Sequence, residues 1–97
     1  MNNLKELKIW SKAIGLAVDV YKATSQFPSE EKFGLTSQSR RAVVSISSNI
    51  AEGAGRTSSK EFNYFLGIAN GSSFELQKMT YGFQKMLTKK ASINKNT

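Results

Sequence analysis

The chain has 97 residues and a formal net charge of +7, and it contains no cysteine and no histidine. This length fits a single domain. The composition excludes disulfide bonds, thiolate zinc sites and cysteine nucleophiles, and it removes the commonest acid–base group. No two of the seven acidic residues have an obvious ligand spacing. We therefore expect a protein that is not an enzyme and that holds neither a cofactor nor a metal ion.

The start of the chain lacks the charged leader and apolar run of a secretory signal. The apolar stretches are only a few residues long, too short to cross a membrane. The expected location is therefore the cytoplasm.

The first helix is predicted over residues 3–26. It ends before Phe27-Pro28, because the residue that precedes a proline is pushed out of helical geometry. Its apolar residues recur three and four apart, the spacing of an amphipathic helix. They are Leu7, Trp10, Ile14, Ala17, Val18 and Tyr21.

A short connector closed by Gly34 precedes the second helix, for which Thr36 is the predicted N-cap. The apolar stripe of this helix is Leu35, Ala42, Val43, Ile46 and Ile50. A polar stripe on the opposite side consists of Arg41, Ser45, Ser48, Asn49 and Glu52. This polar stripe fits either a solvated surface or a buried polar seam against another helix or subunit.

The turn Gly53-Ala54-Gly55-Arg56 follows a helix and has neither the Walker spacing nor a third glycine. We interpret it as a helix stop, with Gly53 or Gly55 in the left-handed conformation. A phosphate could also approach the next helix beside Arg56 and Lys60, because free amides and the helix dipole favour an anion there.

The third helix begins with a capping box, in which Ser58 is the N-cap and Glu61 reaches back to it. Gly67 and Gly71 lie four apart, which fits either a close helix–helix crossing or glycines that the helix merely tolerates. The polar residues 91–97 are expected to form a frayed or disordered tail after a single bundle domain over residues 1–90. The apolar stripe of this helix is Phe62, Phe65, Leu66, Ala69, Ser73, Leu76, Thr80, Phe83 and Leu87.

Basic residues concentrate near the carboxyl end. The first 75 residues carry a balance of +2, whereas residues 76–97 contain five lysines and no acidic residue. Spacings of seven and four put three of these lysines on one helical face, which fits either a phosphate-binding strip or a merely solvated surface. The candidate nucleic-acid-binding residues are Arg40, Arg56, Lys60, Lys78, Lys85, Lys89 and Lys90.

The two adjacent arginines point about 100° apart on a helix and cannot serve one partner together. Arg41 is expected to pair with a carboxylate across the bundle, such as Glu75, whereas Arg40 lies between stripes and is freer to meet phosphate. The candidate structural polar stripe is therefore Arg41, Ser45, Asn49, Glu52 and Glu75. Tyr64, Phe74 and Tyr81 lie off the main stripe of the third helix, and we interpret them as a second packing face rather than as base-stacking groups.

Three segments carry a resemblance to a known family: LKIWSKAIGLAVDVYK, FPSEEKFGLTSQSRRAVVSISSNIAEGAGR and SSKEFNYFLGIANGSSFEL. They resemble the small four-helix-bundle proteins encoded in intervening sequences of bacterial 23S ribosomal RNA genes. That family is similar to the accessory variability determinant of diversity-generating retroelements. The resemblance runs from Leu4 to Leu76. It implies an antiparallel bundle that assembles into a ring-like pentamer, with basic surfaces that meet nucleic acid and, by analogy, a reverse transcriptase as partner.

The chain departs from this pattern at its end, because MTYGFQKMLTKKASINKNT leaves no room for most of a fourth helix. We therefore expect an all-α antiparallel bundle of three helices with an uncovered apolar face, buried between subunits of a homo-oligomer. The expected function is non-enzymatic binding of RNA or DNA through phosphate contacts. The alternative is a protein–protein scaffold or adaptor without nucleic-acid binding.

Overall fold

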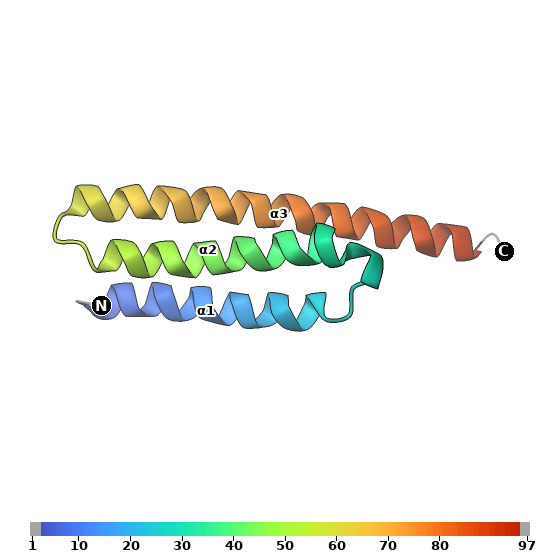
Figure 1. Cartoon of the computed structure of the whole chain (residues 1–97), viewed down its shortest axis with the longest axis horizontal. Coiled ribbons are helices and arrows are strands. Elements are labelled where there is room, and N and C mark those ends of the chain that lie inside the picture. The colour runs from blue at the N-terminus through green and yellow to red at the C-terminus, as the bar shows by residue number, and fades with distance from the viewer. Residues whose placement is uncertain (1–2, 96–97) are drawn as a thin grey trace.

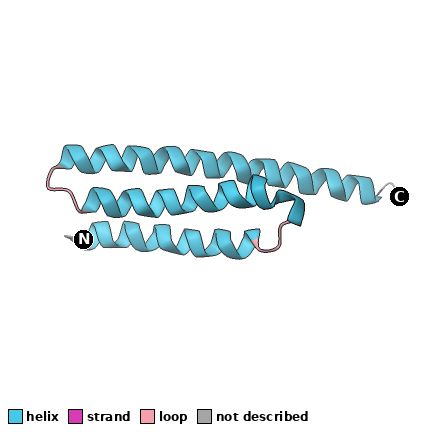
Figure 2. Ribbon diagram, viewed as in Figure 1, coloured by secondary structure: helices cyan, strands magenta, loops and turns pink. Residues whose placement is uncertain are grey.

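The computed structural model describes the backbone of residues 3–95 and the side chains of residues 3–85 and Thr88. This part of the chain forms three α-helices and no strand: α1 (Leu4–Thr24), α2 (Ser37–Ala54) and α3 (Ser59–Lys95). Consecutive helices run antiparallel to each other along a body of 60 × 21 × 20 Å, and α2 packs against both of the others (Figures 1 and 2). The predicted all-α bundle of three helices is confirmed.

Side chains close both ends of α1. At its start the Asn3 side-chain oxygen accepts a hydrogen bond from the Glu6 amide at 2.8 Å. At its end the hydroxyl of the C-cap residue Ser25 donates to the Lys22 carbonyl at 2.6 Å. The helix therefore ends two residues before the predicted Gln26, and Phe27-Pro28 follows after a short turn.

The connector between α1 and α2 differs from the prediction. It forms a 3₁₀ turn at Ser29–Glu31 and a π-turn at Lys32–Thr36 that leads directly into α2. Thr36 directly precedes α2 at the predicted N-cap position, but it has helical backbone angles and its hydroxyl makes no capping hydrogen bond. The Glu31 carboxylate instead accepts from the Leu35 amide at 3.3 Å, one turn earlier.

The turn between α2 and α3 needs no left-handed residue. Gly55 ends α2 with φ −80°, and no residue in the described part of the chain has a positive φ, so the predicted left-handed cap is wrong. Gly53 is required for a different reason. A Cβ atom there would lie 2.9 Å from the Phe65 Cβ and 3.3 Å from the Phe62 carbonyl oxygen. Glycine at this position therefore permits the close approach of α2 and α3.

The core lies along α2. Val43 is completely buried, and the predicted stripe of this helix is confirmed, with Leu35 only half-buried at its edge. From α3 the core takes Ala69 and Leu76 as predicted, together with Met79, which the predicted stripe missed. Phe62, Phe65, Leu66, Ser73 and Phe83 are half-buried, Thr80 is exposed, and the side chain of Leu87 lies outside the described residues.

Helix α1 buries a face that shares only Trp10 and Ala17 with the predicted stripe. Its contacts with the core come from Ile9, Trp10, Ala13, Ala17 and Val20, with Ala13 the most buried. Several residues of the predicted stripe stay exposed, because α2 and α3 cover only one side of this helix. Together with Leu4, which lies outside the predicted stripe, they form what we call the α1 apolar face: Leu4, Leu7, Ile14, Val18 and Tyr21, with exposed fractions of 66%, 46%, 37%, 47% and 43%.

Helix α3 is much longer than its neighbours. Its 37 residues span about 55 Å, and its carboxyl-terminal part projects beyond α1 and α2 (Figure 1). The Phe83 ring stacks on Phe27 at 3.8 Å near the end of α1, where this projection begins. The helix continues to Lys95, further than the predicted end near residue 90, while residues 96 and 97 lie outside the described part.

No helix in the described part of the chain has both the length and the apolarity needed to cross a membrane.

Candidate nucleic-acid interface

The side of α3 that faces away from the core forms a continuous exposed surface. Lys60 and Lys78 are 18 residues apart, which is five full turns, and Lys85 follows after two more turns. Every residue at the intervening face positions is also exposed. We call this surface the outer face of α3 and define it by Lys60, Gly67, Gly71, Phe74, Lys78, Tyr81 and Lys85.

Three of the seven predicted nucleic-acid-binding residues thus lie together on the outer face of α3. The predicted Lys89 and Lys90 follow on the same helix, but their side chains lie outside the described residues. Arg40 and Arg56 lie elsewhere and are held by contacts within the chain.

The outer face also carries exposed aromatic rings. Phe74 and Tyr81 are 62% and 61% exposed, and Tyr64, one turn after Lys60, is 66% exposed. The expected second packing face is therefore not formed within the described side chains. Residues 74 and 81 are seven apart, as are Lys78 and Lys85. This repeat of ring and ammonium was visible in the sequence and was missed.

Arg56 lies in the turn between α2 and α3. Its guanidinium pairs with the Glu52 carboxylate at 2.7 Å and lies 5.0 Å from the centre of the Phe65 ring. Nearby, the Ser58 hydroxyl accepts from the Glu61 amide at 3.1 Å, which confirms Ser58 as the N-cap of α3. The reciprocal bond of a capping box is absent between these two described residues. Because Arg56 already has a carboxylate partner, it is a weaker anion contact than the sequence indicated.

The two adjacent arginines have the opposite roles to those predicted. The Arg40 Nε donates to the Thr24 hydroxyl at 2.9 Å, and its Nη2 donates to the Tyr21 carbonyl at 3.3 Å. Its guanidinium also lies 4.6 Å from the centre of the Tyr21 ring. Arg40 thus ties the end of α1 to α2. Arg41 is exposed.

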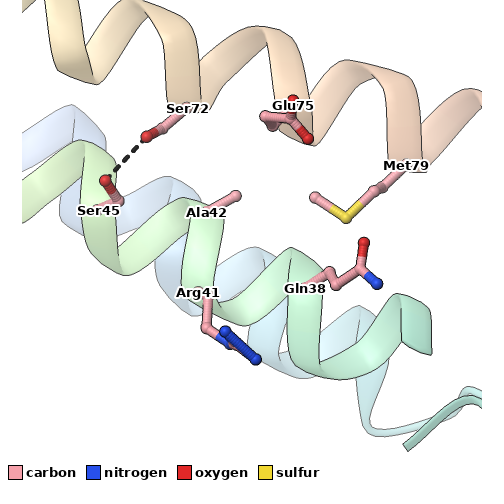
Figure 3. A pocket seen from close by; sticks show the side chains of 7 residues that line it. All are labelled: Gln38, Arg41, Ala42, Ser45, Ser72, Glu75 and Met79. Carbon is pink, nitrogen blue, oxygen red and sulfur yellow. Dashed lines mark hydrogen bonds between the residues drawn. The ribbon is translucent and has the colours of Figure 1, made fainter. Parts of the chain in front are cut away.

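A groove of about 270 Å³ lies on the surface between α2 and α3, and both Arg41 and Glu75 line it (Figure 3). The predicted ion pair between these residues is absent, although both lie within the described side chains. Figure 3 shows the Arg41 guanidinium directed away from α3. Ala42 and Met79 contribute apolar surface to the groove.

The predicted polar stripe of α2 contains both half-buried and exposed residues. Ser45 and Asn49 are half-buried: the Ser72 hydroxyl donates to the Ser45 hydroxyl at 2.8 Å, and Asn49 donates to the Ser45 carbonyl at 2.8 Å. Arg41, Ser48 and Glu52 are exposed. Each of the two interpretations left open by the sequence therefore describes part of the stripe.

Within the described side chains, no group of three or more acidic residues, histidines or cysteines comes together as a metal site. Every buried side-chain nitrogen or oxygen there has a hydrogen-bond partner. What the surface presents instead is a row of lysine ammonium groups and aromatic rings on one helix.

These features define the class of the protein: a small, basic, all-α bundle with an exposed lysine and aromatic face on its longest helix. The sequence model of the 23S rRNA-intervening sequence protein family matches residues 5–95. The chain therefore belongs to this family, and the match extends beyond Leu76, where the resemblance in the sequence ended. A search of curated proteins found no match to the chain.

Proposed function

We propose that this protein is a non-enzymatic, self-associating protein of the bacterial cytoplasm that binds RNA or DNA through phosphate contacts. The observation that carries the proposal is the outer face of α3, where Lys60, Lys78 and Lys85 are all exposed. Lysines on one face neutralise phosphates and release condensed counterions, which favours binding regardless of sequence.

The charge around this face supports the proposal. Glu75 is the acidic residue nearest to Lys78 along α3, but it lies on the groove side beside α2. Lys89, Lys90 and Lys95 continue the basic sequence toward the end of the chain. A polyanion that follows α3 would thus meet a row of cations.

The test is the salt dependence of binding to a labelled structured RNA and to duplex DNA. Three phosphate contacts on a duplex give a slope of log K against log salt of about −2.7. Replacing Lys60, Lys78 and Lys85 with glutamine should flatten the slope by about that amount. The matched control replaces Lys5, Lys8 and Lys12, which are exposed on α1. This control should change the slope much less. No binding at low salt, or equal effects of the two triple variants, would overturn the proposal.

Self-association is supported by the α1 apolar face. Its five large apolar side chains are between 37% and 66% exposed, and burial of such a side chain contributes about 1.5–3 kcal/mol. Val44 of α2 is also 45% exposed and shares a groove of about 530 Å³ with Tyr21. The family resemblance favours a five-membered ring. Sedimentation should show an oligomer that dissociates when Leu7 and Val18 are both replaced by serine.

The same α1 apolar face favours a second candidate function, a docking module for another protein. That function predicts capture of a partner that is insensitive to salt and lost in the Leu7→Ser, Val18→Ser variant. It also predicts that the triple glutamine variant on α3 binds the partner normally. The two functions thus depend on different helices and can be separated.

A further inference from the structure

The outer face of α3 is not needed to hold the fold together. Phe74 and Tyr81 are more than three-fifths exposed, so neither ring contributes much buried area to the core. Exposed apolar residues are common one at a time, but here two rings alternate with two lysines at the same spacing of two turns. The arrangement repeats a ring and a cation along one line of the helix.

The ring and the cation are in contact at one of these repeats. The Lys85 Nζ lies 5.4 Å from the centre of the Tyr81 ring. Because this ammonium group lies over the ring, a base that stacks on Tyr81 either uses the opposite face of the ring or displaces the ammonium toward the phosphate of the base. Lys78 lies one turn from both Phe74 and Tyr81, and so can serve a nucleotide at either ring.

The same face is unobstructed toward the start of the helix. A Cβ atom at Gly67 or at Gly71 would meet nothing within 4 Å. Of the two interpretations of these glycines, the close helix–helix crossing is therefore not formed within the described part of the chain. At Gly67 and Gly71 a strand that runs from Phe74 toward Lys60 would meet the backbone of α3 without a side chain.

We propose that the outer face of α3 binds single-stranded nucleic acid, with bases stacked on Phe74 and Tyr81 and phosphates held by Lys78 and Lys85. This inference rests on the proposed function and narrows its ligand to single strands. Bases in a duplex are stacked on one another and present only their edges, whereas an unpaired base offers its flat surface to an exposed ring. The cationic face selects a polyanion, and the rings select unpaired bases.

The test uses fluorescence anisotropy of the full chain with a labelled oligoadenylate of about 12 nucleotides, its duplex and an abasic strand of equal length. The oligoadenylate should bind more tightly than either of the others. Phe74→Ala and Tyr81→Ala should each weaken its binding about 5- to 150-fold and leave the salt slope unchanged. Phe74→Leu should weaken binding similarly, because it keeps an apolar side chain but removes the ring.

Phe33→Ala is the matched control. Phe33 is 85% exposed and has the Lys32 ammonium 5.6 Å from its ring, but it lies in the connector beside Glu30 and Glu31. Its loss should leave binding unchanged. Circular dichroism should show that all these variants keep the wild-type helix content and melting temperature, because the replaced rings are exposed.

The failures of the two proposals differ. If all three probes bind equally and Phe74→Ala has no effect, the stacking inference is wrong while phosphate binding stands. If none of the probes binds at low salt, both proposals are wrong. If anionic phosphatidylserine vesicles bind in a ring-dependent manner and the oligoadenylate does not, the face is a membrane contact and both proposals are overturned.

Discussion

The two sides of α3 contrast sharply. On the side toward α2, Gly53 leaves no room for a methyl group against Phe65, and the Ser45 and Ser72 hydroxyls are hydrogen-bonded at 2.8 Å. On the outer face, Gly67 and Gly71 have open space around them and Phe74 is 62% exposed. One helix therefore carries a seam where neighbouring side chains contact α3 closely and a face that is exposed to solvent.

This contrast separates residues that the fold requires from residues that it does not. Substitutions in the seam should change the free energy of unfolding. Substitutions on the outer face should leave stability nearly unchanged and alter binding instead. The predictions below test this division with matched pairs of substitutions.

The largest effect is expected in the core along α2. Ile46 is 7% exposed, so Ile46→Ala removes buried methyl groups, leaves a cavity and should lower the free energy of unfolding by about 2–5 kcal/mol. Urea unfolding followed by circular dichroism measures this loss. Ile68→Ala on α3, where the side chain is 38% exposed, is the control and should cost much less. Equal losses would contradict the assignment of the core.

Gly53→Ala should destabilise the protein by about 1–3 kcal/mol, the usual cost of overpacking. Alanine favours a helix over glycine, but the added Cβ would lie 2.9 Å from the Phe65 Cβ, and the two helices would have to move apart. Thermal unfolding is the measurement. A rise in melting temperature would show that α2 and α3 do not approach this closely.

Arg40→Gln should lower the free energy of unfolding by about 1–2 kcal/mol, because it removes the hydrogen bonds to Thr24 and to the Tyr21 carbonyl. Arg41→Gln removes the same charge from the neighbouring exposed position and should change stability by less than about 0.5 kcal/mol. Urea unfolding of both variants measures the two changes in the free energy of unfolding. A larger loss of stability in Arg41→Gln than in Arg40→Gln would instead support the roles that the sequence predicted.

The smallest effect is expected at the outer face. Gly71→Ala makes the same change as Gly53→Ala, but a methyl group here meets nothing within 4 Å. It should therefore raise the free energy of unfolding by about 0.4–1 kcal/mol through helix propensity alone. Differential scanning calorimetry can resolve a shift of this size. A loss of stability would reveal a contact at this face, such as one between subunits.

The helices and the α2 core were predictable because each depends on local patterns. Val43, Ile46 and Ile50 follow the helical period, and Ser58 caps α3 as its sequence indicates. The face that α1 buries was not predictable, since Leu7 and Ile14 are as apolar as Ile9 and Val20. Only the placement of α2 and α3 decides which of these residues become covered.

The candidate site was predictable in part. Lys60, Lys78 and Lys85 share a face because of the helical period, which the sequence contains. The roles of Arg40 and Arg41 depend on how the end of α1 packs beside α2, which no local pattern gives. The exposure of Phe74 and Tyr81 likewise depends on what lies beside α3, which no local pattern gives.

The most direct test of the central claim is to locate the bound nucleic acid on the protein. A single-stranded RNA with 4-thiouridine, crosslinked by near-ultraviolet light to the full chain at low salt, would be mapped by mass spectrometry. The account predicts crosslinks on α3 at Phe74 and Tyr81 that disappear in the Lys60→Gln, Lys78→Gln, Lys85→Gln variant. Crosslinks confined to α1 and α2, or none at all, would contradict it.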